Sequence, residues 1–556
     1  MISRRDLLAS VGSGYAGMQM MPLVSAVLPT ESAKSAVRCI NVINFIRAIE
    51  PRFKTDLLEP VRHQMEINKR HGLPATWLLQ FDALVSGPFV AYLRDHMAKD
   101  HEIGFWFEMN QMHCEAAGVK WRGRPGYEWD HYPTVAFTIG YTHEERIRLA
   151  DTAMREFKKV WGHYPKSVAS WNLDSFTLAH LTETYGMDAY AVCRDQIATD
   201  GFTIWGAPIA GYYPSKKNCW SPAVDIQNQI KTPIYRMLGQ DPVYYYDKNW
   251  KMPDGRTHGE PDTMEPVWPS GRSPEFVRHF LKMIAESPTG QFAYAQLGQE
   301  NSFPWNEQVA GYEPQMKALA ALRAKGTVHV ETMGETGRRF KKAFAKTPGQ
   351  AQVMLDDPFG NAVPARTVWY QNHRYRANLH FRDKTPYLRD LIVYDDSFAQ
   401  PYLDQPTTTN DVEQRMLAAV DGYHWSEKPG STDTRPAGVY LFEGDSPLLI
   451  GGRPRITETS GGLEVVAPLS SGAGLHVGFR TDSVVFKLGG SAKPLALELQ
   501  CDLAKAPQMD VRDKEIHYLW QDHRFALGVA KGTARSTKTG WRIESENNTV
   551  EIKLRA

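Results

Sequence analysis

The feature that most constrains the fold is an alternation of short apolar runs with amphipathic helical stretches between about residues 37 and 345. Stretches such as DLLEPVRHQMEINKRHG and EERIRLADTAMREFKKVWG place apolar residues three and four positions apart, as a helix requires. Strands that alternate with helices predict parallel β/α units. The predicted strands are RCINVINFI, ATWLLQFDAL, HEIGFWFEM, KSVASWNLD, DAYAVCRDQ, PIYRMLGQD, FAYAQLGQE and TVHVETMGE. Seven or eight such units predict a (β/α)7–8 barrel over residues 37–346.

The pattern changes after about residue 350. Runs such as ARTVWYQNHRYRANLHFRD, LHVGFRTDSVVFKLGG and GWRIESENNTVEIKLRA alternate with Gly, Ser, Asn and Asp turns. This pattern predicts an antiparallel β-sandwich over residues 350–556, interrupted by one short helix near residues 407–425. The predicted fold class is therefore α/β, a barrel followed by a C-terminal β-sandwich.

Residues 1–36 differ from both of these parts. The pair Arg4 and Arg5 precedes a weakly apolar stretch that contains Gly and Ala, and small residues follow it. This arrangement resembles a twin-arginine export signal, so we expect a periplasmic or secreted protein. The later apolar runs are too short for membrane insertion. The five cysteines lack metal-finger spacing, and at most one or two disulfides are expected.

Charge excludes one class of partner. Lys plus Arg number 64 and Asp plus Glu number 63, which gives a net charge of +1 and no basic field for nucleic acid. Aromatic residues make up 11% of the chain, which suits either a large core or stacking on sugar faces. A carbohydrate substrate is the predicted partner, and the sequence leaves the oligomeric state open.

Acidic or amide side chains follow nearly every predicted barrel strand. The carboxyl ends of parallel barrel strands converge on one mouth. Like charges packed there raise each other's pKa and cost stability, so a ring of them indicates acids, bases or partners for hydroxyl groups. The alternative is that single carboxylates pair with arginines or cap helices. The residues are Asn44, Glu50, Asp82, Glu108, Asp174, Asp195, Asp241, Glu300 and Glu331.

Two segments, KDHEIGFWFE and PKSVASWNLDSFTLAHLTETYGMDAYAVCRD, resemble the glycoside hydrolase/deacetylase (β/α)-barrel superfamily. It includes polysaccharide deacetylases, family-38 α-mannosidases and family-57 glycosidases. SWNLDSF resembles the family-38 strand end W-x-x-D-P-F-G-H, in which the Asp is the nucleophile and a metal ligand. Trp171, Asp174 and Phe176 match that strand end. The positions of Pro, Gly and His carry other residues, namely Ser175, Thr177 and Leu178.

The metal ligands that this resemblance implies for a deacetylase are missing. Those enzymes use an Asp after the first strand and two His after the third to bind a metal that activates water. Here Ile46 and Arg47 follow Phe45, and the two histidine positions carry Trp106 and Asn110. We therefore expect no metal and no other cofactor. Trp106 is interpreted as a sugar platform or a core aromatic.

The predicted reaction is hydrolysis of a glycosidic bond by two carboxyl groups. Asp174 is the predicted nucleophile or base, or else the cap of the following helix. Glu300 is the predicted acid, because partial desolvation near Trp305 would raise its pKa, or else a binding carboxylate. Glu108 or Asp195 would replace Asp174 if its assignment fails. The predicted substrate-binding residues are Asn44, Glu50, Asp82, Trp106, Glu108, Trp171, Arg194, Asp195, Asp200, Trp205, Arg236, Asp241 and Trp305.

Two other functions stay open at this point. One is a metal-dependent carbohydrate deacetylase in which scattered His and Asp residues build an unfamiliar site. The other is a non-catalytic glycan-binding protein that keeps the cleft of the barrel. The identity of the sugar, endo or exo action, and retention or inversion do not follow from the sequence.

Overall fold

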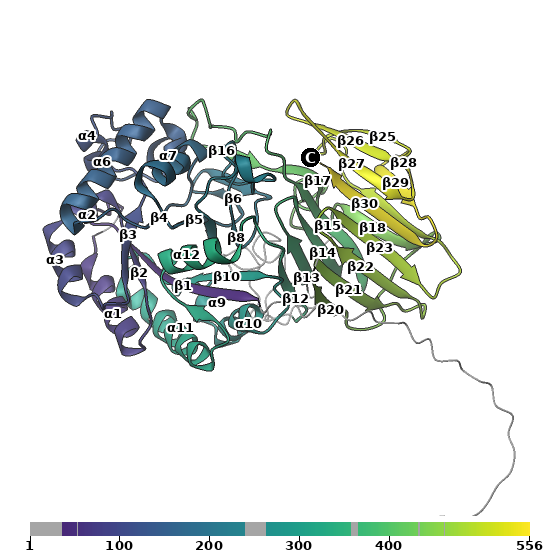
Figure 1. Ribbon diagram of the computed structural model, residues 1–556, viewed down its shortest axis with the longest axis horizontal. Coiled ribbons are helices and arrows are strands. Elements are labelled where there is room, and N and C mark those ends of the chain that lie inside the picture. Colours follow the sequence, from purple (N-terminus) through teal and green to yellow (C-terminus); the bar gives the residue numbers. More distant parts are fainter. Residues whose placement is uncertain are drawn as a thin grey trace, which may run out of the picture.

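The computed structural model describes residues 36–52, 54–238, 263–356, 365–431, 434–460 and 462–555. A barrel-like sheet surrounded by helices lies beside a stack of antiparallel strands (Figure 1). The predicted export signal and Asp241 lie outside the described residues.

The barrel is a largely parallel sheet with the strand order β10-β1-β2-β3-β4-β5-β9-β8, and β11 also pairs with β1. All eight predicted strands are present, and β8 joins as an antiparallel edge. Their bounds are β1 Val37–Ile46, β2 Thr76–Leu79, β3 Glu102–Trp106, β4 Ser167–Ala169, β5 Ala189–Cys193, β8 Gly211–Tyr212, β9 Ile234–Met237, β10 Phe292–Leu297 and β11 His329–Val330. The predicted α/β class with a nearly closed barrel is confirmed.

Helices cover the outside of this sheet (Figure 1). The longer ones are α1 Leu58–Arg70, α3 Gly87–His96, α6 His143–Trp161, α7 Ser175–Tyr185, α10 Pro274–Ala285, α11 Trp305–Lys325 and α12 Met333–Ala343. In α6 the local sequence fixes both ends. Thr142 and Glu145 form a capping box at the start, and Gly162 takes a left-handed φ of 82° at the end. Leu149, Ala153 and other apolar residues of one face are buried.

The C-terminal part contains two antiparallel sheets, as the predicted β-sandwich requires. The larger has the order β12-β13-β14-β15-β18-β24-β29-β28 and the smaller β20-β21-β22-β23-β30-β27-β26-β25. The larger sheet comprises β12 Gln350–Met354, β13 Ala365–Gln371, β14 Tyr375–Arg382, β15 Thr385–Val393, β18 Gly438–Glu443, β24 Leu495–Gln500, β28 Thr533–Thr537 and β29 Gly540–Glu544. The smaller comprises β20 Arg455–Thr459, β21 Gly462–Pro468, β22 Gly474–Phe479, β23 Ser483–Gly489, β25 Gln508–Arg512, β26 Glu515–Trp520, β27 His523–Lys531 and β30 Thr549–Arg555.

The predicted helix near residues 407–425 is wrong. The segment forms β16 Val412–Arg415, which pairs in parallel with β7 Phe202–Trp205, and β17 Leu417–Asp421, which pairs with β15. Two existing sheets offer backbone hydrogen-bond partners, and all of β17 is buried, so tertiary contacts override the local helical pattern. Through β16 the C-terminal part is joined to the barrel part.

All five cysteines are free thiols. Within the described ranges, the helices are too short or too polar to cross a membrane.

Candidate active site

The guanidinium of Arg47 lies at the centre of a group of carboxylates just after β1. Its Nη2 atom is 3.0 Å from Glu300 and 3.5 Å from Glu108, and Nη1 is 3.6 Å from Glu50. The guanidinium carbon of Arg47 also lies 4.0 Å from the centroid of the Trp129 ring. Arg47 and these three glutamates are called the Arg47 centre below. A buried cation beside several carboxylates stabilises their charged forms.

Strand pairing and one asparagine bring these residues together. β1 pairs in parallel with β10, so the loops after both strands leave the sheet at the same edge. Asn301 accepts a hydrogen bond from the backbone N–H of Arg47 and donates to the carbonyls of Arg47 and Leu57. Gly298 has φ +111°, and a Cβ there would lie 2.1 Å from the carbonyl oxygen of Ile43, so only glycine fits this approach. Glu300 is thereby held next to Arg47.

Two buried carboxyl groups have strongly raised pKa values. Burial raises the pKa of Glu108 to about 7, although Arg47 opposes the shift. The indole N–H of Trp129 donates to Glu108 at 3.2 Å. Burial also raises the pKa of Asp82 to about 6, against a 2.7 Å hydrogen bond from the backbone N–H of Ala48. The site therefore holds groups that can carry a proton near neutral pH.

Glu300 and Glu50 complete the centre. The side chain of Glu300 is 13% exposed, more than those of Glu50 and Glu108, which are 1% exposed. Burial raises the pKa of Glu300 and Arg47 opposes this. Glu50 accepts two hydrogen bonds from the guanidinium of Arg52, at 2.7 and 2.5 Å, and one from its backbone N–H at 3.0 Å. Glu300 is thus the carboxylate of the centre that a ligand reaches most easily.

Glu265 is a further acidic residue that the sequence analysis missed. Burial and the charge of Glu300 raise its pKa to about 7. It accepts hydrogen bonds from Thr263 and from the indole N–H of Trp268. Glu265 follows a long polar segment rather than a predicted strand, so a rule based on strand ends could not find it. The signal that was available is an acid followed closely by proline and tryptophan in the loop EPVWP.

The geometry bounds the separation of two carboxyl groups. Glu108 and Glu300 both lie within reach of the same Nη2 atom of Arg47, at 3.5 and 3.0 Å. Their nearest oxygens are therefore at most about 6.5 Å apart, a range that includes the roughly 5–5.5 Å of retaining glycosidases.

Asp174 occupies a different environment. Its side chain accepts hydrogen bonds from the backbone N–H and the hydroxyl of Thr177, at 2.9 and 2.7 Å, and caps α7. It also pairs with Arg146 at 3.0 Å, and both side chains are fully buried. These contacts favour the capping role over the predicted nucleophilic role, because both carboxylate oxygens are already bonded to Thr177 or Arg146.

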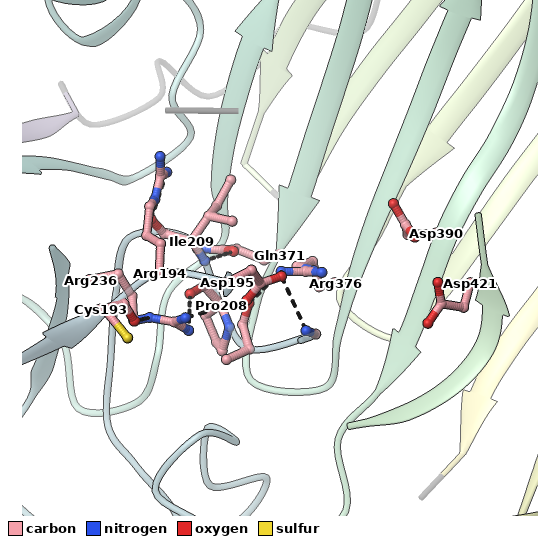
Figure 2. A network of polar contacts seen from close by, with 12 residues as sticks. Cys193, Arg194, Asp195, Pro208, Ile209, Arg236, Gln371, Arg376, Asp390 and Asp421 are labelled. Atoms are coloured by element: carbon pink, nitrogen blue, oxygen red, sulfur yellow. Dashed lines mark hydrogen bonds and ion pairs between the residues drawn. The ribbon is translucent and has the colours of Figure 1, made fainter. Parts of the chain in front are cut away.

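Four predicted substrate-binding residues lie at the junction of the barrel and the sandwich, and Figure 2 labels three of them, Arg194, Asp195 and Arg236. Asp195 pairs with Arg236 at 3.3 Å and with Arg376 of β14 at 2.7 Å. Arg194 donates to the carbonyl of Ile209 and to the side chain of Gln352 in β12. Trp205 is 1% exposed and packs on Tyr423 and His424. These contacts favour a structural role at this junction for Arg194, Asp195, Trp205 and Arg236 over the predicted role in substrate binding.

Some of the remaining predicted binding residues are buried in the core, and others are partly or fully exposed. Trp106 is fully buried and stacks on Phe45 at 3.9 Å, so it is a core aromatic and not a platform. Asn44 is also buried and accepts from the backbone of Gln299 and from Tyr312. Three of the predicted residues are partly or fully exposed. Trp171 lies edge-on to Trp106 at 5.0 Å, and Trp305 stacks on His63 at 4.7 Å. The charge of Asp200 contributes to the raised pKa of Arg52.

The residues do not fit the metal that the fold family implies. The three ligand positions hold Ile46 or Arg47, Trp106 and Asn110, none of which carries an anionic or imidazole donor. In the part of the chain that the structure describes, no group of three or more His, Cys, Asp or Glu side chains is arranged to hold a metal ion. Arg47 supplies the positive charge at this place instead.

Comparison with solved structures bears on the fold. A structure provisionally assigned as a glycoside hydrolase/deacetylase from Parabacteroides distasonis superimposes with a TM-score of 0.50 at 15% identity, covering 69% of this chain and 91% of that one. A provisionally assigned polysaccharide deacetylase from Mycobacterium smegmatis has a TM-score of 0.33 at 13% identity, covering 57% and 96%. No family model and no curated protein matches the sequence. The likeness to the first of these structures shows a shared fold.

Proposed function

We propose that the protein is a carbohydrate-processing hydrolase that cleaves a glycosidic bond at the Arg47 centre. One observation supports this most strongly: Glu108 and Glu300 share one guanidinium nitrogen, and the pKa of Glu108 is raised to about 7. Glycoside hydrolysis uses two carboxyl groups at such a separation, one protonated as the acid and one ionised as the nucleophile.

The two residues have different proposed roles. Glu108 donates its proton to the leaving oxygen as the glycosidic C–O bond breaks. Glu300, whose charged form is favoured by the ion pair with Arg47 at 3.0 Å and which is the more exposed, supplies the electron pair that bonds to the anomeric carbon. Water then attacks that carbon, gives its proton to Glu108 and releases Glu300. This assignment makes Glu300 the nucleophile, whereas the sequence analysis predicted it as the acid.

Glu265 is the rival for the role of acid, because its pKa is also raised to about 7. It is partly exposed, whereas Glu108 is buried. The upper limit of about 6.5 Å on the distance between the nearest oxygens of Glu108 and Glu300 favours Glu108 as the acid. Matched variants of Glu108 and Glu265 distinguish the two residues.

A carbohydrate deacetylase is the second candidate. The first comparison structure is named glycoside hydrolase/deacetylase, which covers this candidate as well as a glycosidase. The lack of suitable metal ligands at the Arg47 centre is the observation against it.

The test uses aryl and alkyl glycosides, whose leaving groups differ in acidity. Glu300→Gln should be slow on every substrate, since bond formation at the anomeric carbon is lost. Glu108→Gln should lose much less activity on a nitrophenyl leaving group than on an alkyl one, because a good leaving group needs little protonation. Glu313→Gln, on the exposed side of α11, is the matched control and should behave like the wild type. If Glu265→Gln and not Glu108→Gln shows the dependence on the leaving group, Glu265 is the acid.

A further inference from the structure

A groove on the sandwich lies outside the barrel site. It is formed over β14, β15 and β18, which lie side by side in the larger sheet (Figure 1). The cavity has a volume of about 540 Å³ and is lined by Arg382, Asp383, Thr385, Tyr387, Thr434, Arg435, Pro436, Tyr440, Pro447 and Leu449. This volume is in the range of small-ligand sites, and one or two sugar rings would occupy it.

The floor of the groove is held rigidly by two tyrosines. Tyr387 and Tyr440 are opposite each other in the register of β15 and β18, and their rings stack at 5.0 Å. The hydroxyl of Tyr440 donates to the carbonyl of Pro436 at 2.6 Å, and that of Tyr387 is 2.8 Å from a ring nitrogen of His380. Leu449, 44% exposed, adds an apolar wall. The walls are therefore preformed and partly apolar, as the C–H face of a sugar requires.

Positive charge dominates the groove. The guanidinium of the exposed Arg435 lies 3.5 Å from the centroid of Tyr440, and Arg382 donates to the carbonyl of Thr434 at 3.1 Å. Burial raises the pKa of Tyr440 to about 12, and Arg435, Arg382 and Arg389 all oppose that shift. Burial together with Arg389 and Arg382 holds the pKa of His380 well below its ordinary value. Asp383 is the acidic residue among the lining side chains.

We infer that this groove binds an acidic sugar unit, a uronate, of a polysaccharide. Guanidinium groups offer the forked donors that carboxylates accept, and Arg435 is exposed where such a group would enter. Leu449 and Pro447 offer an apolar surface to the ring. The saccharide class rests on the proposed function. The positive charge and the shape of the groove do not. The sandwich would thus hold an anionic polymer at a place other than the barrel mouth.

The experiment measures binding of the full chain to polygalacturonate, neutral dextran and polyglutamate by affinity gel electrophoresis. The wild type should be retarded by polygalacturonate and not by dextran, and Arg435→Ala should weaken that retardation about tenfold, the effect of losing one charge-assisted hydrogen bond. Arg512→Ala is the control, because it removes an exposed arginine from β25 of the other sheet. Equal losses in both variants would show nonspecific charge and overturn the inference. Equal retardation by polyglutamate would overturn the sugar class.

Binding is read without turnover, so failure of this inference and failure of the proposed function are distinguishable. Selective loss in Arg435→Ala without hydrolysis of any glycan would leave the groove assigned and remove the glycosidase. Unchanged binding in Arg435→Ala, with hydrolysis that depends on Glu300, would overturn the groove assignment and support the glycosidase.

Discussion

Replacing Arg47 with methionine should destabilise the barrel most at alkaline pH. Methionine keeps much of the side-chain volume and removes the charge that Glu50, Glu108 and Glu300 share. Breaking a buried ion pair by removing one partner costs roughly 3–5 kcal/mol, because the remaining charges are left uncompensated. For a barrel of this size, such a loss of stability should lower the midpoint of thermal unfolding by about 10 °C.

The pH dependence follows from Glu108, whose pKa rises from 4.5 in the unfolded chain to about 7 in the folded state. The folded protein keeps a proton that the unfolded chain loses over this interval, so stability falls as pH rises from 4.5 to 7. This pKa shift of Glu108 corresponds to a loss of roughly 3 kcal/mol in the free energy of unfolding of the wild type over that pH interval. Without Arg47 the folded pKa should rise further, and the loss in the variant should therefore be larger at pH 8 than at pH 5.

The assay is differential scanning calorimetry of both proteins at pH 5 and pH 8. Arg70→Met is the matched control, because the side chain of Arg70 is 50% exposed and water screens its pairs with Glu66 and Glu313. Arg47→Met/Glu108→Gln should recover part of the midpoint at pH 8, since one uncompensated carboxylate is gone. A midpoint for Arg47→Met that matches the wild type at pH 8 would refute the electrostatic account of the centre.

Four further outcomes are expected. Asp174→Asn should lower the unfolding midpoint, because it removes the charge that pairs with Arg146, while the rate of the folded enzyme stays near normal; a rate reduced by orders of magnitude would restore Asp174 as a catalytic residue. Activity should fall as pH rises through about 7, where Glu108 loses its proton, and an unchanged rate up to pH 9 would exclude Glu108 as the acid. Chelator treatment should leave activity unchanged, and loss that Zn²⁺ restores would favour the deacetylase. We also propose export, so the chain recovered from a periplasmic fraction should begin near residues 27 to 37, as N-terminal sequencing would show; retention of Arg4 and Arg5 would contradict this.

The fold could be predicted largely from the sequence, because hydrophobic periodicity reports which face of each element is buried. The eight barrel strands were recognised from short apolar runs such as FAYAQL in β10. The helix predicted near residues 407–425 failed because β16 and β17 depend on partners far away in the chain, Phe202–Trp205 and β15. Such long-range pairing leaves no local pattern.

The candidate site could be predicted only in part. The strand-end rule found Glu50, Asp82, Glu108 and Glu300, which the structure places around or beside Arg47. The same rule selected Asp195, although its charge is used at the domain junction, because a strand end cannot reveal that Arg376 of a later domain covers it. Asp174 shows the other weakness, since a helix cap and a nucleophile occupy the same position after a strand. Arg47 stands at the position of a missing metal ligand, and it is also one of the arginines expected to pair with strand-end carboxylates, as it does with Glu300.

The most direct test of the central claim is to incubate the metal-free protein with a broad panel of polysaccharides and to measure new reducing ends and released acetate in the same samples. A glycosidase at the Arg47 centre should produce new reducing ends without added metal, and Glu300→Gln should produce none. Acetate release that requires a divalent metal and persists in Glu300→Gln would contradict it.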